Sequence, residues 1–385
     1  MSYDSTYKLI HVEFLVLLRH IHTDMFNPNK PYNELPLLPP GNDAITKKVL
    51  EKAIVANRAL AELKGIAGII PNQTIILNTL TLKEAKDSSE IENIFTTQDE
   101  LYKAFSAEGT SINPSVKEIL SYREALWQGF ELIKKKRLIT TREIVKIQEV
   151  LAQNNAGIRS QPGTALKNGR SGETVYTPPY GKDIIQKKLK NLEEYINTDD
   201  DGTDPLIKMA IIHYQFEAIH PFYDGNGRTG RILNVLYLIH RELLDLPILY
   251  LSSFIIKNKS DYYNGLTDVR TKKAWESWII YMLDSVEYTA KDTTKTIKAI
   301  KALLDKTIEK VKRELPKIYS RELVETLFHQ PYIKISHLVE GGLIARQQGS
   351  VYLQQLESIG ILSSKKVGRE MIYVNVGLFK LLKEQ

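Results

Sequence analysis

The sequence predicts a mainly α-helical protein that carries one short β-hairpin and ends in a winged-helix domain. Apolar residues recur at helical spacing through most of the chain. Five glycines and three prolines interrupt this pattern between residues 155 and 182, where a hairpin is expected. In residues 318–385, three short helical patterns precede two β-prone runs around a basic glycine turn, which is the order of a winged helix.

Composition excludes several classes of protein. The 385 residues suffice for two or three domains at about 150 residues a domain, and 43% apolar with 25% charged residues is typical of a soluble globular chain. The absence of cysteine excludes disulfides, thiolate catalysis and cysteine-ligated zinc. The run HVEFLVLLRH is too short and too charged for a signal peptide or a membrane span, so we expect a cytoplasmic protein with no membrane partner. The net charge of +6 is compatible with phosphorylated ligands or nucleic acid but does not select them.

The N-terminal third is expected to be an extended arm followed by helices. Five prolines before residue 42 favour an arm that ends at Gly41, with Asn42 or Asp43 capping the next helix. Apolar periodicity then predicts three helices, over residues 44–65, 79–92 and 97–106.

The middle of the chain is expected to alternate helices with loops. Pro114 stands where one helix begins, and another follows the threonine pair at 140 and 141. The run TVYT is the plausible strand of the hairpin, and helices resume at DIIQKKLKNLEEYI and at LIKMAIIHYQFEAIH, after the acidic loop TDDDGTDP. Residues 291–317 are lysine-rich on one face, and we interpret them as a solvated connecting helix rather than a nucleic-acid-binding one.

Residues 220–231, HPFYDGNGRTGR, concentrate chemically active side chains in one connection between helices. The run GNGRTG fits the G-x-G-x-x-G pattern of dinucleotide-binding folds, but that pattern requires a preceding strand, and the preceding residues have helical periodicity. An EF-hand loop requires glycine at its sixth position and glutamate at its twelfth, and a Walker A loop requires Gly-Lys-Ser/Thr. Neither pattern is present in this stretch.

The residue types in this stretch favour a phosphate site. One helix ends at Pro221 and the next is expected to begin near Arg228, so the residues DGNG can turn backbone N–H groups to one side, where the positive helix end attracts an anion. Arg228 and Arg231 share a helix face, and each guanidinium can bind two phosphate oxygens. Asp224 offers a hard ligand for the Mg²⁺ that accompanies nucleotide phosphates. His220 can accept a proton from a hydroxyl near neutral pH.

Each of these residues also has an ordinary explanation. The histidine could simply end a helix, and the arginines could form surface ion pairs. Six polar roles packed into one connection favour a functional site over that explanation.

The stretch resembles the signature of Fic-domain proteins, His-x-Phe-x-Asp/Glu-Gly-Asn-Gly-Arg-x-x-Arg, at every fixed position. This resemblance implies transfer of AMP from ATP to a hydroxyl side chain of a target protein. It implies that His220 deprotonates that hydroxyl, that Asp224 holds Mg²⁺ and that Phe222 anchors the loop in the core. The residues implied to contact the nucleotide phosphates are Gly225, Asn226, Gly227, Arg228, Thr229, Gly230 and Arg231, with Arg231 mainly at the γ-phosphate.

Other stretches are similar to the same family. ETVYTPPYGKDI resembles a flap that lies over the nucleotide and aligns the target backbone as an added strand. The target-binding residues that this resemblance implies are Thr174, Val175, Tyr176 and Thr177. KSDYYNGLTDVR resembles the segment on the adenine side of the pocket, with Tyr262 or Tyr263 as the contact. Residues 34–106 resemble the N-terminal extension of one Fic class, and the similarity covers about residues 34–290.

The run SSEIEN, which ends at Asn93, resembles the inhibitory motif of this family, Ser/Thr-x-x-x-Glu-Gly/Asn. Ser88 and Glu92 lie one helical turn apart and share a face. The alternative is a capping box at the start of a helix, Ser89-x-x-Glu92. Upstream of a complete Fic motif, the resemblance favours inhibition, with Glu92 bonding Arg231 and displacing the γ-phosphate.

The sequence thus predicts an auto-inhibited protein adenylyltransferase, a nucleotidyltransferase that uses ATP and Mg²⁺. We expect an N-terminal extension over residues 1–110, a Fic catalytic domain over 111–290, a connecting helix over 291–317 and a winged helix over 318–385. Two alternatives stay open: removal of AMP from a modified protein, with Glu92 aligning a water, and a DNA-binding regulator whose Fic half senses nucleotide. The partners that the sequence admits are a target protein, DNA or protein at the winged helix, and a second copy of the chain.

Overall fold

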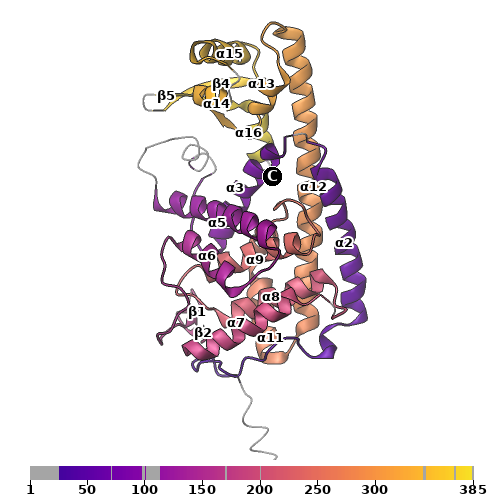
Figure 1. The fold of residues 1–385 in the computed structure, drawn as a ribbon, viewed down its shortest axis with the longest axis vertical. Helices are drawn as coiled ribbons and strands as arrows, with labels where there is room; N and C mark the ends of the chain where they lie inside the picture. Colours follow the sequence, from indigo (N-terminus) through magenta and orange to yellow (C-terminus); the bar gives the residue numbers. More distant parts are fainter. Residues whose placement is uncertain are drawn as a thin grey trace, which may run out of the picture.

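The computed structural model describes residues 26–383 except 71, 98–99, 101–112, 170, 200, 341–343 and 368–369. Figure 1 shows a bundle of helices that carries a smaller C-terminal domain at one end, with one long helix running along both. The helices of the bundle are η1 (Asn42–Ala44), α2 (Lys47–Ala67), α3 (Gln73–Ile91), α5 (Pro114–Lys136), α6 (Thr141–Ala152), α7 (Lys182–Asn197), α8 (Pro205–Ile219), α9 (Asn226–His240), α10 (Ser252–Lys257), α11 (Lys259–Lys272) and α12 (Trp275–Glu314). The predicted mainly helical fold is confirmed. The helix expected over residues 97–106 lies mostly outside the described residues.

The helix cap predicted after the arm was wrong. Asn42 begins the short 3₁₀ turn η1, and Thr46 caps α2, its hydroxyl oxygen accepting the Val49 N–H at 3.3 Å. Before this turn the arm is fixed against α7, where the side chain of Asn191 bonds both the N–H and the C=O of Leu38.

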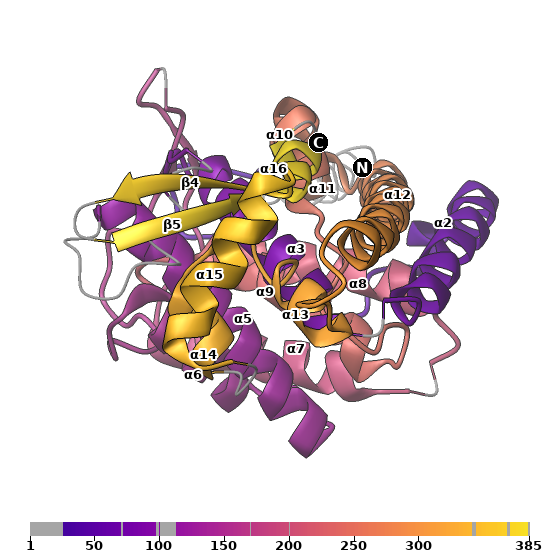
Figure 2. The same cartoon turned by 90° about the horizontal axis from the view of Figure 1, so that it is seen from above.

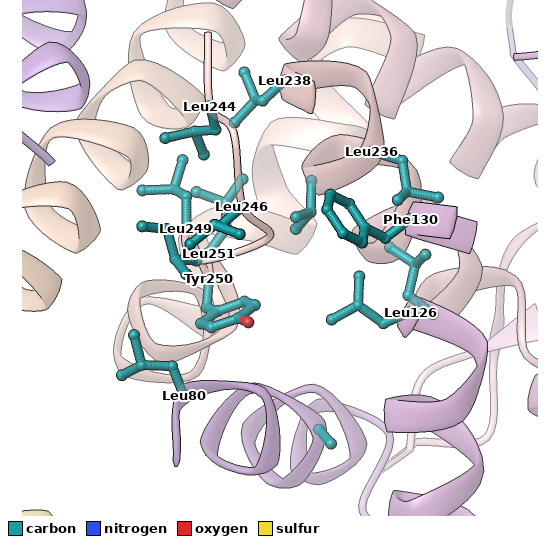
Figure 3. Packing of buried hydrophobic residues seen from close by; sticks show 14 of the residues in the cluster. Leu80, Leu126, Phe130, Leu236, Leu238, Leu244, Leu246, Leu249, Tyr250 and Leu251 are labelled. Carbon is teal, nitrogen blue, oxygen red and sulfur yellow. The ribbon is translucent and has the colours of Figure 1, made fainter. Parts of the chain in front are cut away.

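α8 and α9 form the centre of the bundle, and the connection between them is the 220–231 stretch. Within α8 all residues except Pro205 and Glu217 are buried, which is typical of a helix enclosed on every side. Figure 3 shows side chains of α3, α5, α9 and the segment after α9 packed together. The labelled residues are Leu80, Leu126, Phe130, Leu236, Leu238, Leu244, Leu246, Leu249, Tyr250 and Leu251. This packing fixes α3 and α9 relative to each other.

The predicted hairpin is present in the glycine-rich stretch. Strands β1 (Leu166–Lys167) and β2 (Thr174–Tyr176) pair antiparallel, with a register irregularity between the two residues of β1. The hairpin lies beside α7 in Figure 1.

α12 is one continuous helix of 40 residues, longer than the connecting helix expected over 291–317. The expected boundary at residue 290 therefore falls inside a helix. α2 lies along α12 (Figure 1), and the α12 side chains Ile297, Ile300, Leu304 and Val311 are buried. Only part of the surface of this helix is therefore solvated.

The C-terminal domain combines helices with a small sheet. Its elements are α13 (Arg321–Thr326), β3 (Tyr332–Ile333), α14 (Ile335–Glu340), α15 (Arg346–Ser358), β4 (Leu362–Val367), β5 (Glu370–Asn375) and α16 (Val376–Lys383). The sheet order is β3–β5–β4, all antiparallel, and Figure 2 shows α15 beside β4 and β5. The two predicted strands are β4 and β5. β3 was missed because two residues give no periodicity.

The C-terminal domain also contacts the start of α3. The side-chain nitrogen Nδ2 of Asn72, the residue that caps α3, lies 2.8 Å from Nε2 of His329. Elsewhere, an added Cβ on Gly377 of α16 would lie 3.0 Å from Leu303 of α12, so the two helices pack closely. Among the helices of the described residues, none has a span long and apolar enough to cross a membrane.

Candidate active site

The connection between α8 and α9 turns through two left-handed residues. α8 ends at Ile219, and His220 follows with φ 50°, its N–H bonded to the carbonyl of Phe216. Gly225 precedes α9 with φ 77°, a conformation that glycine adopts without steric cost. α9 begins at Asn226, two residues before the start expected near Arg228.

The loop is held closed from within. The side chain of Phe222 is fully buried, as the resemblance implied. The side-chain oxygen of Asn226 accepts the N–H of Phe222, and its nitrogen donates to the carbonyl of Phe222, both at 2.8 Å. The amide side chain of Asn226 is thus committed to the loop, which leaves its backbone N–H for an anion.

Arg159 positions His220, and sequence reasoning missed it. Its Nε donates to the carbonyl of His220 at 2.7 Å, and its Nη2 donates to Pro179 at 2.6 Å and to Ile219 at 3.1 Å. This buried guanidinium joins the end of α8 to the segment after β2. An arginine in a glycine-rich loop carries no sequence signal for such a role, because its partners come from distant residues.

His220 is held in its neutral form. Burial, and then the positive charge of Arg159, lower the pKa of His220 to about 4, although Glu92 opposes the shift. Within the described part of the chain, its Nδ1 is enclosed and has no hydrogen-bond partner. A neutral imidazole can accept a proton at pH 7.

Arg231 is buried, and two of its guanidinium nitrogens are bonded by the end of α3. Its Nε donates to the hydroxyl of Ser88 at 2.7 Å, and its Nη2 donates to the carbonyl of Ser88 at 2.8 Å and to Oε1 of Glu92 at 2.9 Å. Burial alone would raise the pKa of Glu92, but Arg231 and then Arg228 stabilise the carboxylate, and the pKa is lowered. Burial likewise would lower the pKa of Arg231, and the charge of Glu92 raises it.

The geometry at the end of α3 explains the residue types in SSEIEN. α3 ends at Ile91, and Asn93 follows the cap residue Glu92 with φ 63°. The N–H of Asn93 bonds the carbonyl of Glu90, and the N–H of Ile94 bonds that of Ser89, each at 3.0 Å. These two bonds make a Schellman motif, whose left-handed residue is usually glycine or asparagine. The capping-box alternative was wrong, because Ser89 and Glu92 end this helix and do not begin it.

Lys259 holds the same helix end from outside. Its Nζ, at the start of α11, donates to the carbonyl of Ile91 at 2.6 Å. A cation is favoured at the negative end of a helix. This contact helps to place Glu92 and was not predicted from the sequence.

The carboxylate of Glu92 also lies against the start of α9. An added Cβ on Gly227 would be 2.3 Å from Oε1 of Glu92, so only glycine permits this approach. The N–H of Thr229 is bonded within the helix, to Gly225 at 2.9 Å. The N–H groups before it have no intrahelical acceptor, and they attract an anion. Glu92 therefore occupies the place of an anion in two ways, at Arg231 and at the helix end.

Arg228 and Arg231 turn to different partners. Arg228 pairs with Glu118 of α5 and, at 3.4 Å, with Oδ1 of Asp224. The same Asp224 oxygen accepts the N–H of Gly225 at 2.7 Å, and 70% of the side chain is exposed. Mg²⁺ is commonly held by one or two carboxylates together with substrate phosphates, so an exposed carboxylate beside an anion site fits this ion. Glu118 was not predicted.

The predicted flap residues divide by orientation. Tyr176 is buried and donates its hydroxyl to the carbonyl of Ala218 at 2.6 Å, and the guanidinium of Arg270 lies 4.0 Å over its ring. Val175, on the opposite side of the strand, is 41% exposed. The hydroxyl of Thr177 donates to Pro28 of the N-terminal arm at 2.6 Å. Tyr176 and Thr177 thus fix the hairpin, whereas Val175 faces solvent.

The two tyrosines of α11 differ in the same way. Tyr262 is 2% exposed, and its hydroxyl lies 2.9 Å from Nε2 of His213. Tyr263 is 44% exposed. Of the two, Tyr263 is the one that a ligand can reach.

Three family models match successive parts of the chain. The Fic/DOC family N-terminal model matches residues 50–131, the Fic/DOC family model matches residues 138–238, and the C-terminal domain of SoFic-like protein adenylyltransferases matches residues 303–378.

The chain is similar to several curated proteins. Protein adenylyltransferase fic-1 of Caenorhabditis elegans is 33% identical over 89 residues, which are 23% of this chain and 16% of that protein. A probable protein adenylyltransferase of Aquifex aeolicus is 25% identical over 198 residues, 50% of this chain and 56% of that protein. Protein adenylyltransferase Fic of Nematostella vectensis is 29% identical over 157 residues, 39% and 33% of the two chains. The match covers less than two thirds of each relative.

Solved structures share the fold. A Fic family protein from Desulfovibrio desulfuricans G20 has a TM-score of 0.54 at 18% identity and covers 88% of this chain and 98% of its own. A Fic domain containing signaling protein from Bacteroides thetaiotaomicron has a TM-score of 0.51 at 19% identity and covers 63% and 95%.

Proposed function

Because the chain belongs to the Fic/DOC family, we propose that it is a protein adenylyltransferase that transfers AMP from ATP to a hydroxyl side chain of a target protein. The observation that carries this proposal is an anion site at the start of α9 beside a neutral, half-buried histidine. The protein occupies that anion site with its own Glu92. A triphosphate that replaced this carboxylate would meet Arg231 and the N–H groups around Gly227 together.

The residues suffice for the chemistry of the transfer. His220 takes the proton of the target hydroxyl, whose oxygen forms a bond to the α-phosphorus while the bond from that phosphorus to the pyrophosphate oxygen breaks. The N–H groups at the start of α9 and the guanidinium of Arg231 stabilise the negative charge of the phosphates. Mg²⁺ bound at Asp224 would neutralise part of the same charge. Thr174 and Val175 in the flap are left to align the target backbone.

Glu92 makes the proposed enzyme auto-inhibited. The carboxylate and the γ-phosphate are both anions that require the same guanidinium, and Arg231 has one fork to offer. ATP then binds without its γ-phosphate in that place, and its α-phosphate is not presented to His220.

Replacing Glu92 with glycine is expected to raise the productive occupancy of ATP about 10- to 100-fold, since a charge-assisted contact contributes about 1.5–3 kcal/mol and each 1.4 kcal/mol is about tenfold. Self-modification should rise in parallel, because the chain itself offers hydroxyl side chains. The measurement is autoradiography of purified proteins incubated with α-labelled ATP, with isothermal titration for ATP binding.

Two further variants make this test specific. Glu90→Gly is the matched control, because Glu90 lies on the same helix turn but pairs with Lys86 at 3.0 Å, so it weakens α3 without freeing Arg231. Arg231→Ala added to Glu92→Gly should cancel the gain, because both changes act on one contact. Equal labelling of the parent and the Glu92→Gly protein would refute auto-inhibition.

A second activity on the same site is removal of AMP from a modified protein. The observation that favours it is the electrostatic proximity of the Glu92 carboxylate to His220, where it could align a water. Release of AMP from a modified target by the parent but not by Glu92→Gly would identify this reaction.

We also propose that residues 318–385 form a winged-helix domain. The order α13, β3, α14, α15, β4, β5 supports this assignment, with β4 and β5 as the wing. A winged-helix domain of this kind would bind DNA. A mobility shift that weakens steeply with salt would be its signature.

A further inference from the structure

Glu217 is a half-buried residue with a carboxyl group for which the mechanism above has no use. It lies on α8, three residues before His220. Among the described residues, its Oε1 is buried and has no hydrogen-bond partner. A buried polar atom left unpaired is unfavourable, and such atoms in native proteins often belong to functional sites.

Glu217 faces the same side of α9 as the inhibitory carboxylate. An added Cβ on Gly230 would lie 2.5 Å from Oε1 of Glu217, and one on Gly227 would lie 2.3 Å from Oε1 of Glu92. Gly227 and Gly230 are three residues apart, so they are neighbours on the surface of α9. Two carboxyls thus lie against adjacent glycines, near the single guanidinium of Arg231.

The two carboxyls are unequal partners of Arg231. Glu92 makes the direct contact. Burial raises the pKa of Glu217 to about 7, Arg231 opposes this shift, and the charge of Glu92 adds to it. A phosphate in the place of Glu92 would carry more negative charge than a carboxylate and would favour the protonated form of Glu217 further.

We propose that Glu217 is a positioning residue for the terminal phosphate of ATP, to which its protonated carboxyl donates a hydrogen bond once that phosphate has displaced Glu92. This inference rests on the proposed function. Arg231 and the N–H groups at the start of α9 bind the phosphate from one side. Glu217 of α8 lies against Gly230, one helix turn further along α9, and supplies a hydrogen-bond donor there. ADP, which lacks the terminal phosphate, gains nothing from this donor.

Most other titratable groups around Glu217 do not change their protonation state near neutral pH. Burial raises the pKa of Tyr262 well above its usual value and that of Tyr263 to about 12, and it lowers the pKa of His213 to about 3. Arg231 remains protonated. Glu84 and Asp87 of α3 are exceptions, because burial raises the pKa of Glu84 to about 7 and that of Asp87 to about 6, so each requires its own control.

The experiment measures dissociation constants of ATP and ADP by isothermal titration of the full chain at about pH 6 and about pH 8.5. The parent is Glu92→Gly, in which Arg231 is open. Its affinity for ATP should fall roughly tenfold between these pH values as Glu217 ionises, and its affinity for ADP should change much less.

Glu217→Gln in the same background is the decisive variant, because glutamine keeps a donor N–H and cannot ionise. It should bind ATP at about pH 6 within about twofold of the parent and lose most of the pH dependence. Comparing the two proteins cancels the titration of the nucleotide itself. Glu217→Ala should lose affinity for ATP at about pH 6 and leave ADP unaffected, whereas Glu84→Gln and Asp87→Asn should each keep the pH dependence of the parent.

Several results would overturn the inference: equal pH dependence for ATP and ADP in the parent, the same dependence after Glu217→Gln, or equal loss of both nucleotides after Glu217→Ala. The comparison of ATP with ADP in the Glu92→Gly protein requires no variant at Glu217. It therefore tests the inference even if a substitution at Glu217 unfolds the protein. Nucleotide binding is measured without AMP transfer. Failure here would leave the proposed function standing, whereas failure of Glu92→Gly to raise ATP binding and labelling would count against that function.

Discussion

Replacing His220 with alanine is expected to lower the rate of AMP transfer by about 10²–10⁴-fold, the usual contribution of a general base, while ATP binding stays close to that of the parent. The loop should survive the change, because Arg159 holds the backbone carbonyl of residue 220 and Asn226 holds that of Phe222. Transfer from α-labelled ATP in the Glu92→Gly background measures the rate, and isothermal titration measures binding.

A second variant separates chemistry from backbone strain at this position. His220 has φ 50°, which asparagine tolerates better than alanine does. His220→Asn should therefore be as inactive as His220→Ala and at least as stable. Loss of ATP binding together with transfer in both variants would mean that the ring is structural.

The same residue predicts the acid limb of the pH–rate profile. Because the pKa of His220 is lowered to about 4, the imidazole is neutral and able to accept a proton at all pH values above that. In the Glu92→Gly protein, kcat/KM should therefore not fall between about pH 7.5 and pH 5.5 because of the protonation of His220. A limb centred near pH 6.5 and traceable to His220 would contradict the enclosed environment of the ring.

Replacing Asp224 with alanine is expected to reduce Mg²⁺-dependent transfer by about 10³-fold or more. A metal ion supplies several kcal/mol of charge stabilisation in a transition state, and each 1.36 kcal/mol is about tenfold in rate. The side chain is exposed and lies at the protein surface, so its loss should cost little stability. The measurement is labelling from α-labelled ATP across a titration of MgCl₂.

Asp224→Asn is the matched control for the local backbone. Asparagine keeps an oxygen that can accept the N–H of Gly225, as Oδ1 of Asp224 does at 2.7 Å, but it lacks the negative charge. Both variants should therefore be inactive with the loop intact. Full activity of the parent in excess EDTA, or of Asp224→Asn at ordinary MgCl₂, would remove the metal from the mechanism.

The active-site loop was readable from the sequence because its chemistry is contiguous. Twelve consecutive residues contain the proposed base, the proposed metal ligand, the glycines and both arginines, and their spacing determines which of them share a helix face. The contact between Glu92 and Arg231 was expected from SSEIEN for a similar reason, although the choice between the end and the beginning of a helix required the structure.

The residues that were missed act through tertiary contacts. Arg159 bonds the carbonyl of His220 across 61 positions, and Glu118 pairs with Arg228 across 110. The residues next to Arg159 and Glu118 in the sequence do not distinguish either of them from an ordinary charged surface residue. Glu217 was missed for the opposite reason, because it is one of several polar residues scattered through a mainly apolar helix. The difference between Tyr262 and Tyr263 likewise depends on which of them faces His213.

The continuity of α12 determines where this molecule can bend. Forty residues at 1.5 Å each make a helix about 60 Å long. A hinge at residue 290 would have to break backbone hydrogen bonds within this helix. The chain leaves α12 at Glu314 and enters α13 at Arg321, and a swing of the C-terminal domain about this segment would also have to separate α16 from α12. A swing there would pull His329 from Asn72 and so release the first turn of the helix that ends in Glu92. Through His329 the C-terminal domain thus contacts the residue that caps α3, the helix that precedes Glu92.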